Sequence, residues 1–416
     1  MPINVAAHRE RRSALAGMRP APLPHAAPRD DRFARDVHCV LGLPVDIVGL
    51  DEAVARVRDA IARRQPCFLS TPNLNFVVAA RSDAEFRDSV IASDLCVADG
   101  MPLVWVAQLC GIPLIERVAG ADVFQALKAP RGEPLAVYLY GGAEGIAAAA
   151  ERRLNDERSG LVCVGHESPG YGPVETLCRP ASVARINASG ADFLVVSLGA
   201  KKGQSWIGRN LARLGVPVVS HLGAVVNFAA GTVRRAPAWM QRSGLEWLWR
   251  IRQERLLLGR YLADGLAFLG LLFTRVLPYA WHVRMTATRE PLNPASFQVQ
   301  DSGAELVIRL RGAWTRGDLE PLRYCFARAA TLKRHVRLDL SRVQHVDSAF
   351  LGLVLVLYGA QRRELCRLVC APVTPAVEKT FRYACCEFLL GWHATAPAPK
   401  SGTDPVFQSE NAGRRS

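Results

Sequence analysis

One carboxylate stands out because it separates two apolar stretches of the chain. Asp99 lies in LCVADGMPLVWVAQLCG, residues 95–111, where the first apolar run stops at Asp99-Gly100 and the second begins with a different periodicity. A carboxylate at the end of a buried strand can accept a proton from a hydroxyl group. The alternative is a turn in which Asp99 caps the following helix, and the local residues allow both.

Three other stretches place polar residues directly after apolar segments. Their amide, hydroxyl and cationic groups are typical of sites for anionic or sugar-bearing ligands. The candidate binding residues are Thr71, Asn73 and Asn75 in STPNLN, Arg117, Gly120 and Asp122 in ERVAGAD, and Gly199, Lys201, Lys202 and Gln204 in SLGAKKGQSW. For Asn73 and Asn75, capping of a loop or helix is the alternative interpretation.

The remaining chemical signals are weaker. The GGAEG stretch, residues 141–145, lacks the full spacing of a dinucleotide-binding loop, so a plain strand–helix turn is favoured over an oxidoreductase site. His166 and His221 follow apolar segments and are expected to be satisfied structural histidines. The part of the chain that carries these candidate residues has no Asp-x-Asp pair that would hold a divalent metal through diphosphate oxygens. We expect no cofactor.

The elements around these residues predict an α/β fold. From Cys39 to about Tyr261, short apolar segments alternate with amphipathic ones, for example an expected strand and loop over 67–73 and an expected helix over 74–93. This alternation favours a Rossmann-like, mostly parallel sheet with helices on both faces. Because ligands bind beyond the carboxyl ends of parallel strands, Asp99 is expected to lie at the site.

Length and composition allow two domains and an anionic partner. The chain has 416 residues, a formal charge of +14 and eleven cysteines that mostly sit in apolar runs. The charge is compatible with nucleic acid, a membrane surface or a phosphate-bearing substrate. The cysteines favour buried free thiols over a disulfide framework.

The chain divides into five expected segments. Residues 1–36 are basic and rich in proline and alanine, without an apolar signal segment, and we expect a disordered arm. A larger α/β domain over 37–274 precedes a proline-containing linker over 275–295 and a smaller α/β unit over 296–394. Residues 395–416 are expected to form a disordered tail.

The motifs, taken together, resemble one enzyme family. TPNLNFVVAAR, SDLCVADGMPLVWVAQLCG, ERVAGAD, SLGAKKGQSWI and GTVRRAPAWMQRSGLEWLWRIRQE look like successive motifs of the WecG/TagA/CpsF glycosyltransferases. The resemblance implies metal-independent, inverting transfer of a hexose or N-acetylhexosamine. The donor would be a nucleotide-sugar, usually UDP-linked, and the acceptor would be polyprenyl-diphosphate-linked rather than a nucleic acid.

The resemblance also implies roles for individual residues. Asp99 matches the proposed general base, and Thr71, Asn73 and Arg117 match pocket residues. Two positions depart from the family pattern: the usual pocket glutamine is Gly203, and an acidic position after the last strand is Asn227. Altered donor preference and reduced activity are both compatible with these changes.

The segment 244–274 is interpreted as an appendage that faces a membrane. It mixes tryptophan and arginine with leucine, and Arg260 and Asp264 interrupt any apolar span of about 20 residues. This composition suits the headgroup layer of an anionic leaflet, with a core helix or an oligomer interface as the alternative. By resemblance, Arg250, Arg255 and Arg260 are candidates to reach the active site.

The second unit resembles a STAS domain through VRLDLSRVQHVDSAFLGLVLV. The position that accepts phosphate in regulatory members is Ala349, so we expect a docking or regulatory module without that switch, and Ser348 as a helix cap. The sequence thus predicts a glycosyltransferase at the inner face of the cytoplasmic membrane, acting in surface or exopolysaccharide synthesis. It has a possible protein partner at the STAS domain, and self-association is possible. The alternative is a catalytically impaired scaffold that acts through the STAS domain.

Overall fold

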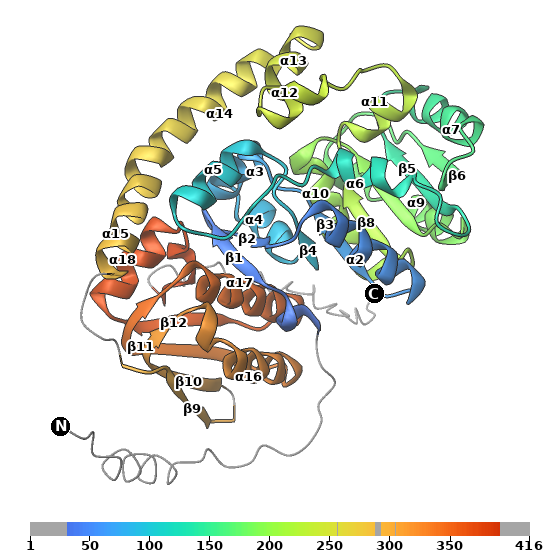
Figure 1. Ribbon diagram of the computed structural model, residues 1–416. Helices are drawn as coiled ribbons and strands as arrows, with labels where there is room; N and C mark the ends of the chain where they lie inside the picture. Colours follow the sequence, from blue (N-terminus) through green and yellow to red (C-terminus); the bar gives the residue numbers. More distant parts are fainter. Residues whose placement is uncertain (1–30, 256, 288–292, 304, 392–416) are drawn as a thin grey trace, which may run out of the picture.

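The computed structural model describes residues 31–255, 257–287, 293–303 and 305–391. They form two α/β units, and one long helix runs along the same side of both (Figure 1). Residues 1–30 of the arm expected over 1–36, and the tail expected over 395–416, lie outside the described residues.

The larger unit is built on a six-stranded sheet in the order β4-β3-β8-β7-β5-β6, and all of its strand pairs are parallel. The predicted doubly covered parallel sheet is therefore confirmed. Its strands are β3 (Cys67–Ser70), β4 (Leu95–Cys96), β5 (Leu135–Gly141), β6 (Leu161–Glu167), β7 (Phe193–Ser197) and β8 (Val218–His221).

Side chains alternate between the two faces of this sheet, as the two-residue period of a strand requires. Val137 and Leu139 of β5 enter one apolar core, whereas Tyr138 and Tyr140 enter the other. The covering helices are α2 (Leu50–Ala62), α3 (Leu74–Ser82), α4 (Ala84–Ile91), α5 (Met101–Leu109), α6 (Gly120–Leu127), α7 (Ile146–Asp156), α8 (Val174–Leu177), α9 (Pro180–Ala188), α10 (Ala200–Asn210) and α11 (Val225–Ala230), with a 3-10 turn η2 (Leu211–Arg213).

The single helix expected over 74–93 is wrong. The chain forms two helices, α3 and α4, because Asp83 adopts an extended conformation and its side chain caps α4 by accepting a hydrogen bond from the Phe86 N–H. A local side chain thus competes with continuation of the helix.

The predicted arm also ends earlier than expected. Residues 31–34 form a 3-10 turn, η1 (Asp31–Ala34), whose Phe33 is buried in the core of the smaller unit. Arg35 is buried as well, and its guanidinium makes a two-point contact with Asp46 at 2.5 and 2.9 Å. The hairpin of β1 (Val37–Val40) and β2 (Leu43–Asp46) follows directly.

The smaller unit has the sheet order β12-β11-β10-β9. β10, β11 and β12 pair in parallel, and β9 adds an antiparallel edge that the apolar pattern did not reveal, because most of its residues are exposed. Its elements are β9 (Ser296–Asp301), β10 (Glu305–Trp314), η4 (Arg316–Asp318), α16 (Glu320–Thr331), β11 (His335–Val346), α17 (Ser348–Arg363), β12 (Leu368–Val373), α18 (Pro375–Tyr383) and η5 (Glu387–Leu389).

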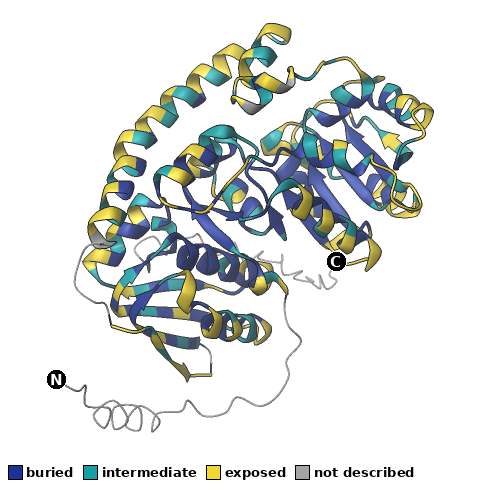
Figure 2. Ribbon diagram, viewed as in Figure 1, coloured by how far each residue is buried: buried dark blue, intermediate teal, exposed yellow. Residues whose placement is uncertain are grey.

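Helix α17 joins the two units. It lies between its own sheet and β1 of the larger unit, so it is buried on both sides (Figure 2). A Cβ atom on Gly352 would lie 2.1 Å from the Val37 carbonyl oxygen, which shows how closely the two backbones approach. Asp347 caps α17, and Ser348 is not the cap: its hydroxyl lies 2.9 Å from Nδ1 of His38.

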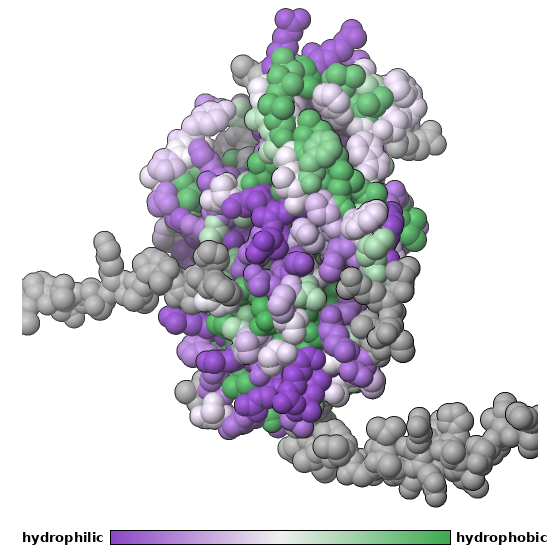
Figure 3. All heavy atoms as spheres, turned by 90° about the vertical axis from the view of Figure 1, so that its left-hand side faces the viewer, coloured by the Kyte–Doolittle hydropathy of each residue, from purple (hydrophilic) through white to green (hydrophobic). Residues whose placement is uncertain are grey.

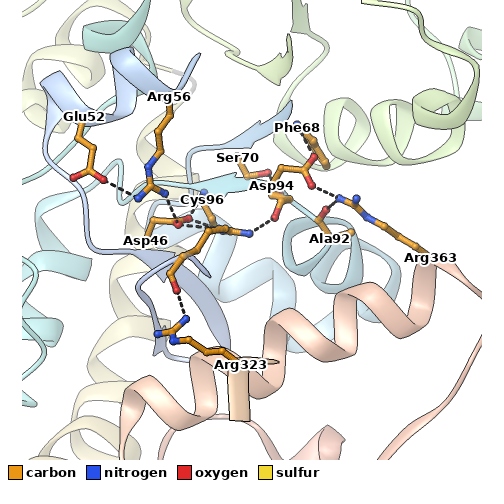
Figure 4. Close-up of polar contacts among 12 residues, drawn as sticks. Asp46, Glu52, Arg56, Phe68, Ser70, Ala92, Asp94, Cys96, Arg323 and Arg363 are labelled. Atoms are coloured by element: carbon orange, nitrogen blue, oxygen red, sulfur yellow. Dashed lines mark hydrogen bonds and ion pairs between the residues drawn. The ribbon is translucent and has the colours of Figure 1, made fainter. Parts of the chain in front are cut away.

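Polar contacts continue this interface (Figure 4). Arg363 of α17 donates to the Asp94 carboxylate at 2.9 Å, and Arg323 of α16 donates to the Phe33 carbonyl oxygen at 2.8 Å. Asp94 also accepts from the Phe68 N–H of β3, so the smaller unit contacts residues that hold the central sheet. The smaller unit is packed directly against the larger unit.

The linker expected over 275–295 is wrong for residues 275–287. α14 (Leu257–Leu271) continues through a π-helical turn (Leu272–Val276) into α15 (Leu277–Ala287). Pro278 does not end the helix, because the wider π turn immediately before it changes the hydrogen-bonding pattern: the Leu277 N–H donates to the Leu272 carbonyl oxygen. Residues 288–292 lie outside the described part.

The same continuation corrects the expectation that no apolar span exists. Residues 257–285 form a helix long and apolar enough, by length and composition, to cross a membrane. Eight of its large apolar side chains are exposed, and Figure 3 shows hydrophobic residues gathered along the upper half of this face. Its inner side chains, including Leu271, Val276 and Tyr279, pack against the core around α3 and α5.

The eleven cysteines are all free, and ten are buried, which confirms the expected thiols.

Candidate active site

Asp99 lies between β4 and α5, at the carboxyl edge of the sheet. Its N–H donates to the Pro72 carbonyl oxygen at 2.8 Å, which ties the turn to the end of β3. The N-terminal cap of α5 is Gly100, without a side-chain hydrogen bond. The capping interpretation is therefore wrong, and the Asp99 carboxylate instead accepts from the Gly120 N–H at 3.4 Å.

Arg117 connects Asp99 to two other carboxylates. Its Nη1 lies 3.6 Å from Asp99 Oδ1 and 3.3 Å from Glu246 Oε2, and its Nη2 lies 3.0 Å from Asp122 Oδ2. The predicted grouping of Asp99, Arg117, Gly120 and Asp122 is found in the structure, because the loop before α6 lies beside the end of β4.

Sequence reasoning missed two members of this cluster, Glu246 and Arg235. Arg235 lies in the loop before α12 (Ala238–Arg242), and its Nη1 contacts Asp122 Oδ1 at 2.6 Å. Glu246 lies in the first turn of α13 (Glu246–Gln253). Both stand in the GTVRRAPAWMQRSGLEW stretch, but no local spacing links that stretch to residue 117, so only the tertiary fold brings them together.

The surroundings of Asp99 change its proton affinity. Burial raises the pKa of the Asp99 carboxyl to about 7, with Glu246 also raising it and Arg117 opposing the rise. A carboxylate with a pKa near neutrality is well suited to general-base catalysis at physiological pH.

The residues that follow β3 serve different purposes. Thr71 is buried, and its hydroxyl is 3.4 Å from the position that a Cβ on Gly120 would take. Asn73 caps α3 by accepting from the Phe76 N–H, as its alternative interpretation proposed. Asn75 does not join the Asp99 cluster: its amide donates to Asp264 of α14 at 3.1 Å.

The residues that follow β7 lie apart from the Asp99 cluster. Gly199 caps α10 with a φ of 82°, and Lys202 donates to the Gly172 carbonyl oxygen at 2.9 Å. Lys201 pairs with Asp83 at 2.5 Å. Gln204 is fully buried and donates to the Ser70 hydroxyl at 2.9 Å, and its role in substrate binding stays a prediction.

The two departures from the family pattern have different surroundings. A Cβ on Gly203 would lie 2.1 Å from Cδ2 of His221, so the imidazole occupies the space beside that glycine. His221 is buried and its Nε2 has no partner among the described residues, and burial lowers its pKa to about 4. It is not the satisfied histidine that the sequence suggested. Asn227 is partly exposed in α11.

The appendage delivers a carboxylate to the cluster rather than its expected arginines. Arg250 pairs with Glu254 at 2.9 Å, Arg255 is exposed, and the Arg260 guanidinium lies over the Tyr261 ring at 5.2 Å. A turn at Gly244 packs on Met101 and Trp105 of α5 and so positions the start of α13. Among the described residues, no group of three or more His, Cys, Asp or Glu side chains could hold a metal ion.

Sequence comparison identifies matches over both units. Residues 38–280 match the Glycosyl transferase WecG/TagA/CpsF family, and residues 297–391 match the Mlab, STAS domain. The first match extends past the expected boundary at residue 274 into the long helix. A Bacillus subtilis (strain 168) protein named N-acetylglucosaminyldiphosphoundecaprenol N-acetyl-beta-D-mannosaminyltransferase is 30% identical over 185 residues, which are 44% of this chain and 70% of the relative.

Two solved structures show only distant likeness. The Bacillus cell fate determinant SpoIIAA in the phosphorylated form is 21% identical with a TM-score of 0.20, over 23% of this chain and 88% of the other. A sulfate-associated mutant of arylmalonate decarboxylase is 20% identical with a TM-score of 0.19, over 46% of this chain and 79% of the other. At TM-scores this low, neither likeness bears on function.

Proposed function

Because the chain belongs to the WecG/TagA/CpsF glycosyltransferase family, we propose that it moves a hexose or N-acetylhexosamine from a UDP-sugar to a polyprenyl-diphosphate-linked sugar. The observation that carries this proposal is the cluster at the carboxyl edge of the sheet, where Asp99 lies 3.6 Å from Arg117. The B. subtilis relative, named for an N-acetylglucosaminyl-diphospho-undecaprenol acceptor, supports this class of acceptor.

In the proposed reaction, Asp99 removes the proton from the acceptor hydroxyl. The resulting oxygen attacks the anomeric carbon, the bond from that carbon to the UDP oxygen breaks, and the configuration inverts. Positioning the hydroxyl, the anomeric carbon and the base in line supplies much of the rate acceleration in such displacements. Gly120, whose N–H donates to Asp99, and Thr71, which lies beside Gly120, are proposed to contact the acceptor.

Arginines supply the positive charge that the departing diphosphate requires. Arg117 and Arg235 are adjacent to Asp99 or its neighbours, and Arg250, Arg255 and Arg260 are the proposed additional cations on the appendage. Guanidinium groups bind phosphate oxygens in a two-point geometry. We propose that these groups act without a divalent metal.

The long helix is proposed to lie on the inner leaflet of the cytoplasmic membrane. Leu262, Leu266 and Phe273 are exposed on it, and a polyprenyl acceptor would present its diphosphate at the same surface. The inner side of the helix is packed against the transferase core, so a spanning helix would have to abandon that contact. Self-association also remains a prediction.

The STAS-like unit is proposed to brace the transferase unit rather than to bind a separate protein through α17. The face of α17 that is not covered by its own sheet already packs on β1. A protein partner at the remaining surface of this unit stays a prediction.

Transfer measured with a polyprenyl-diphosphate-linked N-acetylglucosamine acceptor and a panel of UDP-sugars tests the proposal. We expect the wild-type chain to release UDP with one of these donors in the presence of a chelator. Asp99→Asn should reduce transfer by about 10²-fold or more, because a positioned base contributes about that factor, while nucleotide binding persists.

Asp59→Asn is the matched control, since Asp59 lies on an exposed face of α2 and pairs with Arg63. Full transfer by Asp99→Asn would remove Asp99 from the base role. Failure of the wild-type chain with every donor would favour the scaffold alternative, for which the replacements at Gly203 and Asn227 are the motivation.

A further inference from the structure

We propose that Glu246 is a positioning residue that acts on the reaction through Arg117. Its carboxylate binds the Arg117 guanidinium, so that this group is not paired with Asp99 alone. This inference rests on the proposed function, in which Asp99 is the base. Glu246 comes from the appendage, more than 100 residues from Asp99 in the sequence.

The contact geometry shows how Arg117 is shared. A single nitrogen, Nη1, faces both Glu246 Oε2 at 3.3 Å and Asp99 Oδ1 at 3.6 Å, and the shorter distance is to Glu246. The other nitrogen, Nη2, faces Asp122 Oδ2 at 3.0 Å. The base is therefore the most distant of the three carboxylates that Arg117 contacts.

Arg235 holds Glu246 and Asp122 in place. Its Nη1 contacts Asp122 Oδ1 at 2.6 Å, and its Nη2 lies 3.6 Å from Glu246 Oε1. The charged groups that face Asp99 thus come from the loop before α6 (Arg117), from α6 (Asp122) and from α13 (Glu246), with Arg235 behind them. Three carboxylates share two guanidinium groups.

This arrangement favours a competent base. An arginine paired with Asp99 alone would stabilise the ionised carboxylate, and a carboxylate with a low pKa accepts protons poorly. Glu246 opposes this in two ways: its charge repels that of Asp99, and it competes for Nη1 of Arg117. Glu246 accordingly raises the pKa of Asp99, after the larger effect of burial.

Because Glu246 belongs to the appendage, docking of that segment affects the base. α13 begins two residues after Gly244, whose turn packs on Met101 and Trp105 of α5. When the appendage is in this position, Glu246 reaches Arg117. If the appendage moved away, Arg117 would be free to pair with Asp99.

The pH dependence of transfer by Glu246→Gln tests this role. Transfer requires ionised Asp99, so kcat/KM rises as pH increases through the Asp99 pKa. Loss of the Glu246 charge lowers that pKa. We therefore expect the acidic limb of the pH–rate profile to move to lower pH by about one unit. The rate on the plateau should fall about threefold, because the base is weaker.

Glu254→Gln is the matched control, since Glu254 lies at the end of the same helix and pairs with Arg250. Its acidic limb should stay at the wild-type position. A role of Glu246 in appendage docking alone would change KM for the acceptor and leave the limb in place, and an unmoved limb in Glu246→Gln overturns the inference.

If Glu246→Gln shows no transfer at all, carbon-13 NMR of aspartate-labelled protein follows the Asp99 carboxyl directly, with the signal assigned by its loss in Asp99→Asn. A titration at lower pH than in the wild type supports the inference, and an equal or higher titration overturns it. Transfer by Asp99→Asn would refute the assignment of Asp99 as the base. If Asp99→Asn is inactive but the acidic limb of the Glu246→Gln pH–rate profile does not move, only this inference is refuted.

Discussion

Arg117 and Gly203 show what single residues contribute to this site. Arg117 gathers three carboxylates from separate parts of the chain, and it was identifiable as a site residue from its position in the ERVAGAD stretch. Gly203 stands where the family pattern has a pocket glutamine, so the sequence suggested the loss of a binding side chain. In the structure, the His221 ring lies in the space that a side chain at position 203 would need.

Gly203→Ala should therefore destabilise the protein, although alanine normally stabilises a helix relative to glycine. The added Cβ would lie 2.1 Å from His221 Cδ2. We expect the free energy of unfolding to fall by about 1–3 kcal/mol, the usual cost of overpacking a core. Thermal or denaturant unfolding measures this change.

Gly208→Ala in the same helix is the control, because a Cβ there would meet Ser89 Cβ at an ordinary 3.8 Å. It should leave stability unchanged or raise it by about 0.5–1 kcal/mol. Replacing His221 by glycine in the Gly203→Ala background should remove the added penalty. Equal stabilities of the two single variants would contradict the proposed contact.

The long helix shows how an element can change the interpretation of a sequence segment. Its proline and polar residues suggested a linker, but the π turn at Leu272–Val276 allows the helix to continue past Pro278. The continued helix presents apolar side chains outward, and hydrophobic residues gather along the upper half of this face (Figure 3). An exposed apolar face of this extent typically marks a contact surface.

The variant Leu266→Glu/Phe273→Glu tests membrane contact by this helix. Both side chains are about two-thirds or more exposed, at 71% and 66%, so the fold should tolerate the change. We expect binding to anionic phospholipid vesicles to weaken by about tenfold or more, because two apolar groups of this size are lost from the interface and two negative charges are added. Vesicle co-sedimentation measures this.

Leu365→Glu is the matched control, since Leu365 is 91% exposed and lies just beyond α17, away from the long helix. It should bind vesicles as the wild type does. Release of the wild-type protein from vesicles by alkaline carbonate is expected for a helix that lies on the surface. Retention after that treatment would instead indicate a spanning helix and contradict the proposed arrangement.

At the scale of the whole molecule, the core of the STAS-like unit takes in residues of the transferase unit. Phe33, Val37 and Ile91 of the transferase side belong to the same apolar cluster as α17. The sequence alone favoured a docking or regulatory module. The apolar residues on the second side of α17 find their partner only in the other unit.

Gly352→Ala should weaken this joint. A Cβ at position 352 would lie 2.1 Å from the Val37 carbonyl oxygen, and a backbone atom cannot rotate away. We expect both units to unfold together at a lower temperature, with a loss of about 2 kcal/mol or more in the free energy of unfolding. Calorimetry reports the transition.

Gly317→Ala is the control, because no atom of the described residues, apart from its own chain neighbours, lies within 4 Å of the corresponding Cβ position. Its transition should remain within about 0.5 kcal/mol of the wild type. Two separate transitions in the wild-type protein, with only one of them changed by Gly352→Ala, would show that the units are not joined as proposed.

The sequence by itself determined the parallel α/β sheet, the free thiols and the grouping of Asp99 with Arg117, Gly120 and Asp122. It could do so because strand and helix periods are local, and because the carboxyl ends of parallel strands share one edge of the sheet. These features need no knowledge of distant contacts.

Only the tertiary structure decided that Glu246 and Arg235 complete the site, that Gln204 is buried, that His221 faces Gly203 and that α17 is covered by β1. Each of these depends on contacts between residues far apart in the chain. Local composition specifies which side chains can be buried or paired, but the partner of each is set by the packing of whole elements.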